Sequence, residues 1–510
     1  MSELVPVVDL FAGPGGLSEG FSAVGRREGN PYFNIALSIE KDIYAYNTLL
    51  LRSYFRQFPH GSAPDEYYSF LRGEISFQEL LLNEEDGRTH YRKKMAKMQA
   101  WHATLGSGKD FDEKLDSRIE EITKKSDRWI LIGGPPCQAY SIIGRARNSR
   151  NIKYNPEEDE RTHLYKEYLR ILAKHKPAVF LMENVKGIIS SKLNGRSIID
   201  KIIHDLERPS MIYRNLGPVS YKIFSLVKDE ENKGQTPYIG LKPVDFVIEC
   251  EKYGIPQKRH RLILLGIRED LYVPPRPNIL KEEKLYKVSD IIDGLPKLRS
   301  GLSREHDNAQ AWVNRLKEAL QMPWLEEVKG MSGTEVYRDI KDTIQFITSP
   351  ARDRGDEFIP FDTTLSDKYL SQWFIDPRIG GVCNHHSKSH MVEDIYRYLY
   401  VSSYGKCYGN SPRLDDFPTG LLPKHENVNS GHFDDRFRVQ VWDQPSTTIT
   451  SHLEKDGHYY IHPDPFQSRS LTVREAARLQ TFPDNYFFCG GKKQQYKQVG
   501  NAVPPLLAYK

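Results

Sequence analysis

Apolar runs that end in a short polar turn recur along the first part of the chain. Such runs are typical of strands buried on both faces, and the segments between several of them have a helix-like pattern. Strands that alternate with helices favour an α/β fold with a doubly wound, mostly parallel sheet. The runs are VPVVDL from residue 5, FNIALSIE from 33, WILIGG from 129, AVFLMENV from 178 and RLILLGIR from 261.

Three chemically useful side chains lie where predicted strands end. Glu40 closes the second run, Cys137 follows the third, and Glu183 follows the apolar part of the fourth. In open α/β sheets, ligands bind in the crevice beyond the carboxyl ends of the strands. We therefore expect these three residues to line one crevice.

The texture of the chain changes near residue 272. From about Tyr272 to Tyr460 the strand-helix alternation fades and Pro, Gly, Tyr and His become more frequent, whereas regularity returns with SLTVREAARLQTFPD. This pattern predicts a catalytic domain over residues 1–271 and a second, smaller and irregular domain over 272–460. Residues 461–510 are expected to return to the first domain.

Composition narrows the class of protein further. The 510 residues are 39% hydrophobic and 27% charged, with a net charge of +4. Such a chain is large enough to bury a sizeable core, and it contains no run of the ~20 apolar residues that cross a bilayer. The first residues show no basic leader, so we expect a cytoplasmic protein without membrane contact. The small positive charge fits a polyanionic partner only if it is clustered.

Cysteine usage points to a reducing compartment. The five cysteines are scattered and form no CxxC pair, so a disulfide framework is not expected. Cys383, His385, His386 and His390 lie close in sequence, but their spacing matches no standard zinc-ligand pattern, and we predict no metal site.

The segment FAGPGG, residues 11–16, allows a ligand to approach the backbone just before a helix. Glu40, at the end of the next strand, is placed to accept hydrogen bonds from the two ribose hydroxyls of a nucleoside cofactor. Alone this signal is weak, because many turns of this kind are purely structural. The turn is not GxGxxG, which disfavours a nicotinamide enzyme.

The segment GGPPCQAYS is more specific. Two prolines stiffen the backbone before Cys137, and Arg145, Arg147 and Arg150 follow. A free thiol titrates near ~8.5, and neighbouring cations lower that value and favour the nucleophilic thiolate. The alternative is an inert buried cysteine, the commoner fate of a lone thiol.

Glu183 follows an almost continuous apolar strand in AVFLMENV. Partial burial raises the pKa of a carboxyl group, which then donates as well as accepts a proton. The alternative interpretation is a helix cap or an ion pair with Lys186.

Taken together and in order, these motifs resemble those of the C5-cytosine DNA methyltransferases. DLFAGPGG is similar to the family's first cofactor motif and GGPPCQAYS to its nucleophile motif. MENV, IPQKRHRLILLG, LTVREAARLQTFPD and QVGNAVPP resemble later motifs, and the set spans nearly the whole chain. The resemblance implies the class I S-adenosylmethionine-dependent methyltransferase fold, with residues 272–460 as a target-recognition domain.

The resemblance implies a chemical role for four residues. Cys137 would add to C6 of cytosine and so activate C5 for methylation, while Glu183 would hydrogen-bond N3 and the exocyclic amine. Arg261 would contact the carbonyl oxygen of the base, and Arg259 would support the region of the nucleophile and phosphate. Asp159 and Arg161, in EDERTHL, match the motif that precedes the strand ending in Glu183.

The resemblance also implies a set of residues for S-adenosylmethionine. Glu74, in GEIS, is the best match to the acidic residue that the family carries after its third strand, and Lys41 stands where the family often has an aromatic residue. The implied cofactor-binding residues are Phe11, Gly13, Gly15, Gly16, Glu40, Glu74, Pro136, Leu164 and Asn501.

A stacked base is out of reach of this chemistry, so the target cytosine must be flipped out of double-stranded DNA. The loop after the nucleophile is expected to bind the DNA through Ser141, Arg145, Arg147, Arg150 and Lys153. The resemblance further implies a prokaryotic, monomeric enzyme that marks self DNA beside a cognate restriction or defence nuclease.

Two other functions share this scaffold. A cytosine-5 methyltransferase acting on transfer RNA would use the same chemistry, but such relatives are compact in the region that is long here. A non-catalytic DNA-binding regulator would have lost Cys137 or Glu183, and both are present.

Overall fold

The computed structural model describes residues 4–81, 87–136, 160–193, 195–229, 241–423 and 436–510. Its central feature is an eight-stranded sheet in the order β3-β2-β1-β4-β5-β11-β8, with β9 paired to β11. The strands are β1 Val5–Leu10, β2 Phe33–Glu40, β3 Ala100–His102, β4 Ile130–Gly133, β5 Val179–Val185, β8 Tyr221–Phe224, β9 Val247–Glu249 and β11 His260–Arg268. The five strands from β3 to β5 pair in parallel, and β11 runs antiparallel to its neighbours. The predicted mostly parallel α/β sheet is confirmed.

Successive side chains of a strand point to opposite faces of the sheet, so the strands contribute to two apolar layers. In β1, Val8 and Leu10 face one layer while Val7 faces the other. In β2, however, Ile35 and Leu37 face opposite layers although they are two residues apart. The pairing of β1 with β2 skips one residue between them, so a β-bulge shifts the alternation by one position.

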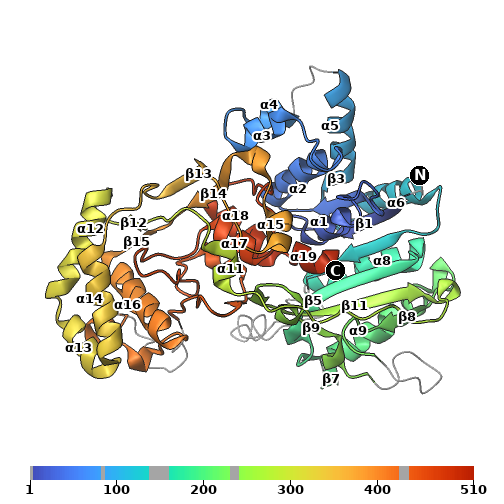
Figure 1. The fold of residues 1–510 in the computed structure, drawn as a ribbon. Coiled ribbons are helices and arrows are strands. Elements are labelled where there is room, and N and C mark those ends of the chain that lie inside the picture. Colours follow the sequence, from blue (N-terminus) through green and yellow to red (C-terminus); the bar gives the residue numbers. More distant parts are fainter. Residues whose placement is uncertain (1–3, 82–86, 137–159, 194, 230–240, 424–435) are drawn as a thin grey trace.

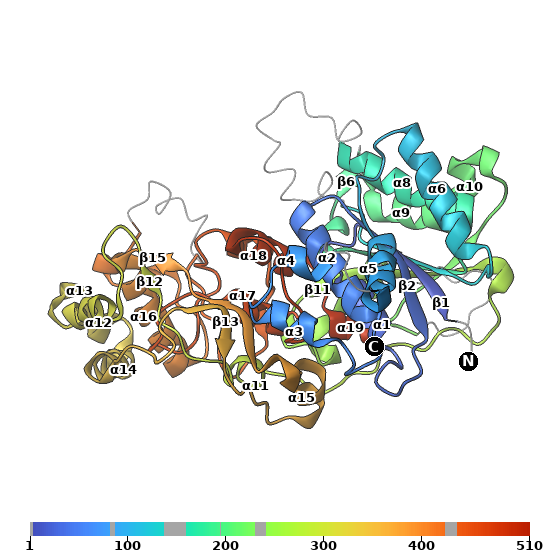
Figure 2. The ribbon, with the colours of Figure 1, turned by 90° about the horizontal axis from the view of Figure 1, so that it is seen from above.

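Helices cover both faces of the sheet (Figure 1, Figure 2). One layer is closed by α6 Lys109–Thr123, α8 Glu160–His175 and α9 Ile198–Glu207. The other is closed by α1 Gly16–Ala23 and by α19 Pro505–Tyr509. A Cβ on Gly20 of α1 would lie 2.4 Å from the carbonyl oxygen of Pro505, so α1 and α19 touch through their backbones. The end of the described chain therefore completes the layer that its beginning starts.

A helical insertion lies beyond one edge of the sheet. The chain between β2 and β3 forms α2 Ile43–Arg56, α3 Asp65–Leu71, α4 Phe77–Leu81 and α5 Gly87–Gln99. These helices surround an apolar core that also contains Ile379 and Cys383. Both residues come from the region 272–460, which is called the second lobe below. The insertion is thus one of the places where the two lobes join.

The second lobe contains more helix than its sequence suggests (Figure 1). Its helices α12 Ala309–Glu318, α13 Pro323–Met331, α14 Gly333–Phe346 and α16 Val392–Tyr408 pack around Trp312 and Trp324. Tyr396, Tyr398 and Tyr400 of α16 are buried in that core, although the sequence of this region predicts little regular structure. The loops and short strands of this lobe lie between the helices and the sheet domain.

The remaining elements of the described chain are short. They include α10 Pro209–Ile212, α11 Val288–Ile292, α15 Lys368–Phe374, β6 Lys192–Leu193, β7 Arg196–Ser197, β10 Gln257–Lys258, β12 Gly301–Leu302, β13 Gly355–Pro360, β14 Gly381–His386, β15 Ser389–His390 and β16 Ser446–Thr447. Within the described residues, no helix combines the length and the apolar character needed to span a bilayer.

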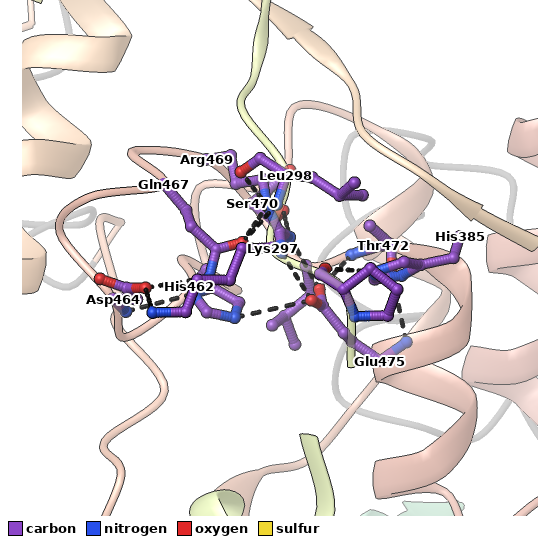
Figure 3. A network of polar contacts seen from close by, with 12 residues as sticks. Lys297, Leu298, His385, His462, Asp464, Gln467, Arg469, Ser470, Thr472 and Glu475 are labelled. Atoms are coloured by element: carbon purple, nitrogen blue, oxygen red, sulfur yellow. Dashed lines mark hydrogen bonds and ion pairs between the residues drawn. The ribbon is translucent and has the colours of Figure 1, made fainter. Parts of the chain in front are cut away.

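The segment around α17 Val473–Leu479 connects the two lobes (Figure 3). Arg469 donates to both carboxylate oxygens of Glu475, at 2.6 and 2.8 Å, and this pair is almost completely buried. Glu475 also accepts the backbone N–H of Thr472, which caps the helix. His385, from β14 of the second lobe, bonds Thr472 and the carbonyl oxygen of Pro296. Burial lowers the pKa of His385 to about 4, so this histidine is neutral at pH 7.

The other two arginines of this segment are also fully buried. Arg474 donates to the carbonyl oxygens of Cys383, Pro483 and Tyr486. Arg478 forms a two-point ion pair with Asp484 and donates to the carbonyl oxygen of Ile291. A buried guanidinium is tolerated only when its donors are satisfied, so these contacts fix the position of α17 against both lobes.

We expect Glu475→Gln to lower the free energy of unfolding by about 3–5 kcal/mol, because it leaves the buried Arg469 without its counter-charge. Urea unfolding of the purified protein measures the change. Glu120→Gln, at an exposed position of α6, is the matched control and should change it little. Equal effects of the two substitutions would contradict the role given to the buried pair.

Candidate active site

The glycine loop after β1 is held to the end of β2 by Glu40. Phe11 and Gly13 have positive φ values of 58° and 56°, which turn the chain sharply. The Gly13 N–H donates to Glu40 Oε2 at 2.9 Å, and the Asp42 N–H donates to Oε1 at 2.8 Å. Each carboxylate oxygen keeps a free lone pair, so Glu40 shapes the loop and retains acceptors for a ligand.

The three glycines of this loop have different environments. A Cβ on Gly16 would lie 2.1 Å from the carbonyl oxygen of Val503, and one on Gly15 would lie 2.7 Å from Leu49. At Gly13 no atom lies within 4 Å of that position. Gly16 is therefore required by packing against backbone and Gly15 by its φ of 96°, while Gly13 is the glycine that opens toward free space.

The expected position of Glu74 is wrong. The third strand in chain order is β3, which ends at His102, whereas Glu74 lies in the turn after α3. It is exposed and forms an ion pair with Arg72 at 2.6 Å. The sequence match was misleading because the helical insertion separates β2 from β3 by 59 residues.

The remaining expected cofactor residues are dispersed. Phe11 is half-buried and packs against the apolar layer that contains Leu164, which is 8% exposed. Pro136 is half-buried at the end of the loop after β4, and Asn501 is exposed as the last residue of α18 Lys492–Asn501. Their contact with a cofactor stays a prediction.

Glu183 and Arg261 form an ion pair at the ends of β5 and β11. The antiparallel register sets Arg261 opposite Val185, and Arg261 Nε lies 2.8 Å from Glu183 Oε1. The two side chains are 12% and 14% exposed, so the pair is largely shielded from water but still reachable. The strand pairing thus brings together two residues that lie 78 positions apart.

The loop after β4 lies against the same carboxylate. A Cβ on Gly134 would lie 2.9 Å from Glu183 Oε2, so a glycine is needed for the close approach. Buried Asn184 accepts the N–H of Val185 at 2.9 Å and donates to the carbonyl oxygen of Pro135 at 3.4 Å. The backbone that leads to residue 137 is therefore tied to the end of β5. Sequence analysis gave Asn184 no role, although its place beside Glu183 was the available signal.

Several predicted residues cannot be placed. Cys137 and Asp159 lie outside the described residues, as do Ser141, Arg145, Arg147, Arg150 and Lys153. Arg161 belongs to α8, and its side chain is not described.

Arg259 has a different environment from that of Arg261. It is 1% exposed and donates to the carbonyl oxygens of Ile449, Gly500 and Ala502 at 2.6, 3.2 and 2.7 Å. Burial, followed by the charge of Arg261, lowers its pKa to about 9. These contacts make Arg259 a positioning residue that fixes the end of α18 behind the site, and its expected action on a nucleophile or phosphate stays a prediction.

Gln257, in the same motif, was missed by the sequence analysis. It is fully buried, accepts the N–H of Ile449 at 2.8 Å and donates to Gln480 at 2.8 Å. Its contacts join the strand before Arg259 to the segment around α17.

The cysteine and histidines of β14 and β15 bond to separate groups. Cys383 lies 3.5 Å from the carbonyl oxygen of Leu71, His385 bonds Thr472, and His390 lies 3.2 Å from Ser470. Within the described residues, no three His, Cys, Asp or Glu side chains are grouped so that they could hold a metal ion.

The sheet order and the site together define a class of enzyme. The glycine loop held by Glu40 lies at the ends of β1 and β2, and the Glu183–Arg261 ion pair lies at the ends of β5 and β11. This is the arrangement of a class I methyltransferase.

Comparison with known proteins gives the family. The model of the C-5 cytosine-specific DNA methylase family matches residues 90–216 and 243–510. The chain is 29% identical to the type II methyltransferase M.Bpa9945I of Bacillus paralicheniformis, over 98% of this chain and 96% of that protein. It is 27% identical to the DNA (cytosine-5-)-methyltransferase M.ApeKI of Aeropyrum pernix, over 75% and 80%. The structure of the S. pombe Dnmt2 methyltransferase aligns with a TM-score of 0.40 at 12% identity, covering 99% of this chain and 96% of that one.

The chain therefore belongs to the C-5 cytosine-specific DNA methylase family. It is a DNA (cytosine-5-)-methyltransferase, and membership of the family implies a methyl donor of the S-adenosylmethionine type.

Asp9, on β1 just before the glycine loop, is a buried carboxyl group that makes folding stability depend on pH. Its Oδ2 accepts the Ser18 hydroxyl at 2.5 Å, and its Oδ1 has no hydrogen-bond partner among the described residues. Burial raises the pKa of Asp9 to about 7, against the partial opposition of the Ser18 hydrogen bond. The folded protein thus holds a proton that the unfolded chain releases near pH 3.8.

We expect the free energy of unfolding to fall as pH rises from about 4 to 7, by up to about 1.4 kcal/mol per pH unit from this group. Asp9→Asn removes the titration, so the variant should gain stability relative to the parent as pH rises from 5 to 7. Urea unfolding at both pH values measures the difference. A difference that stays constant between them would contradict the assignment.

Proposed function

We propose that this enzyme methylates C5 of a flipped-out cytosine in double-stranded DNA through transient covalent addition of Cys137 to C6 of the base. The observation that carries the proposal is the Glu183–Arg261 pair at 2.8 Å, beside the backbone that leads to residue 137. The resemblance of GGPPCQAYS to the nucleophile motif supports the role of Cys137, which lies outside the described residues.

Glu183 and Arg261 would divide the edge of the base between them. Arg261 Nε occupies one side of Glu183 Oε1, which orients the carboxylate and leaves Oε2 toward Gly134. A carboxyl group in this position would hydrogen-bond N3 and the exocyclic amine of cytosine, and the guanidinium would bond the carbonyl oxygen. Such contacts stabilise the negative charge that develops on the ring when a thiolate attacks C6.

The proposed reaction begins with the Cys137 thiolate and regenerates it at the end. The Cys137 thiolate forms an S–C6 bond, and the electron pair of the C5–C6 double bond makes C5 nucleophilic. C5 would take the methyl group from the sulfonium of the donor, whose sulfur keeps the bonding pair and leaves as a thioether. A general base would then take the C5 proton, the C5–H electron pair would restore the C5–C6 double bond, and the S–C6 electron pair would return to sulfur. The thiolate is regenerated, so the cysteine is a true catalyst.

The residues at the ends of β1 and β2 suit S-adenosylmethionine. The open side of Gly13 admits a ligand close to the backbone, and Glu40 retains acceptors for ribose hydroxyls. Phe11, beside this loop, offers a ring for the adenine. When bound, this cofactor supplies the electrophilic methyl group.

Cationic side chains after Cys137 would help to bind the DNA backbone. Flipping the base costs a few kcal/mol, and the arginines and Lys153 of the loop after Cys137 would offset part of that cost by binding phosphates. The names of the relatives, type II methyltransferases, support a role in marking self DNA in a restriction-modification system.

Cys137→Ser should abolish methyl transfer while DNA binding remains, because a hydroxyl is a far weaker nucleophile than a thiolate. Transfer of a labelled methyl group to duplex DNA measures turnover. Duplex DNA containing 5-fluorocytosine should trap an adduct that survives denaturation with the parent enzyme and not with Cys137→Ser. Full turnover by the variant would exclude Cys137 as the nucleophile.

Glu183→Gln should lower kcat by about 10²–10³-fold, the usual cost of removing one group that stabilises developing charge. Glu251→Gln is the control, since Glu251, in the 3₁₀ turn after β9, is about as buried as Glu183 but pairs with His260 rather than with Arg261. Single-turnover methylation of duplex DNA measures both. Similar losses in the two variants would point to a structural effect and contradict the assignment.

A further inference from the structure

A groove opens where the second lobe meets the strand that carries Arg261. It has a volume of about 290 Å³ and lies between β10, the segment after α16 and the residues leading to β16. Polar and charged side chains dominate its lining: Lys258, Asn410, Arg413, Arg438, Gln444 and Thr447.

The charge of the groove is of one sign. Lys258, Arg413 and Arg438 are cationic, and no acidic residue is found among the described residues that line the groove. Lys258 and Arg413 are exposed, and among the described residues neither forms an ion pair with a carboxylate. The Asp416 carboxylate accepts the backbone N–H of Arg413 at 2.8 Å. A groove with this charge suits an anion.

The groove is built before any ligand arrives. Buried Gln440 accepts the N–H and the hydroxyl of Thr447, at 2.9 and 3.1 Å, and donates to the carbonyl oxygen of Tyr459. Gln444 donates to the carbonyl oxygen of Gly409 at 2.8 Å and accepts from Lys258 Nζ at 3.1 Å. Both glutamine amides are therefore occupied by the protein, and the groups left to meet a ligand are chiefly the cations.

Its location relates the groove to the candidate active site. Lys258 precedes Arg261 by three residues, across a turn in which the Arg259 N–H bonds the Gln257 carbonyl oxygen at 2.8 Å. Thr448 donates to the carbonyl oxygen of Lys258 at 2.6 Å, which holds β10 against the second lobe. The groove therefore borders the chain segment that leads into the strand carrying Arg261.

We propose that this groove binds a phosphodiester group of the DNA strand, through Lys258 and Arg413. This inference rests on the proposed function, because it takes DNA as the substrate. An ammonium group and a guanidinium fork are both suited to phosphate oxygens, and the amides of Gln440 and Gln444, which could otherwise read an adenine edge, already bond to the protein. The contact is independent of sequence and would position the strand rather than select it.

The test measures how DNA affinity depends on salt. The variants are Lys258→Gln, Arg413→Gln and the double variant, and the control is Lys125→Gln, which removes an exposed charge at the amino ends of the strands. Each phosphate contact contributes about 0.9 to the slope of log K against log salt concentration. We expect each single variant to lower the magnitude of the slope by about 0.9 and the double variant by about 1.8, with no change in the control.

A second measurement locates the phosphate. Duplexes with a single neutral methylphosphonate, moved step by step along the strand, should weaken binding by the parent at one position and leave binding by the double variant unchanged there. Unchanged slopes in the variants would overturn the proposal. So would a change in the methylated sequence with an unchanged slope, because that result would make the groove a reader of bases.

The outcome for the groove is separable from the outcome for the proposed function. Methyl transfer by the parent enzyme tests the function, and the slopes test the groove. If the enzyme methylates DNA but all variants give identical slopes, the proposed function is supported and the proposed phosphate site in the groove is rejected. If the chain binds DNA with the predicted slopes but transfers no methyl group, the phosphate site is supported and the proposed function is rejected.

Discussion

The buried ion pair between Arg469 and Glu475 is the contact on which the arrangement of the two lobes depends. Two charges taken out of water are stable only when each is the other's partner and the remaining donors and acceptors are also satisfied. Here Glu475 caps α17, Arg469 reaches Gln467, and His385 adds a bond from the second lobe. Because few geometries satisfy all these groups at once, the network specifies how the lobes meet.

That junction has a direct consequence for the candidate active site. Gln257 reaches the segment around α17, and Arg259 is held by carbonyl oxygens at the end of α18. Both residues lie on the strand that continues to Arg261. The ion pair of Arg261 with Glu183 is therefore supported from behind by the same elements that join the lobes. The two arginines of this motif have different roles. Arg259 is buried and supports the strand, whereas Arg261 faces the candidate site.

The candidate site combines groups from four strand ends, and each group is set by a backbone constraint. Glu40 is fixed by two N–H donors, Glu183 by its register with β11, and the loop after β4 by the space left at Gly134. Beyond this edge lies the cationic groove of Lys258 and Arg413. The open side of Gly13, the acid–guanidinium pair and the groove would serve three chemically different groups: a nucleoside, a base and a phosphate.

Sequence alone determined the α/β class and the strands, because a strand buried on both faces must be apolar throughout and the chain shows that pattern plainly. It also predicted candidate site residues in the short motifs, since the glycines, Glu40 and Glu183 are recognisable by residue type and by their position after a strand. Tertiary structure decided what no local pattern records. It showed that Glu74 belongs to a helical insertion, that Gly16 is required by Val503, nearly 500 residues away, and that Arg259 and Arg261 have different environments. The physical reason is that burial and pairing depend on neighbours distant in sequence, whereas periodicity reports only which residues prefer to leave water.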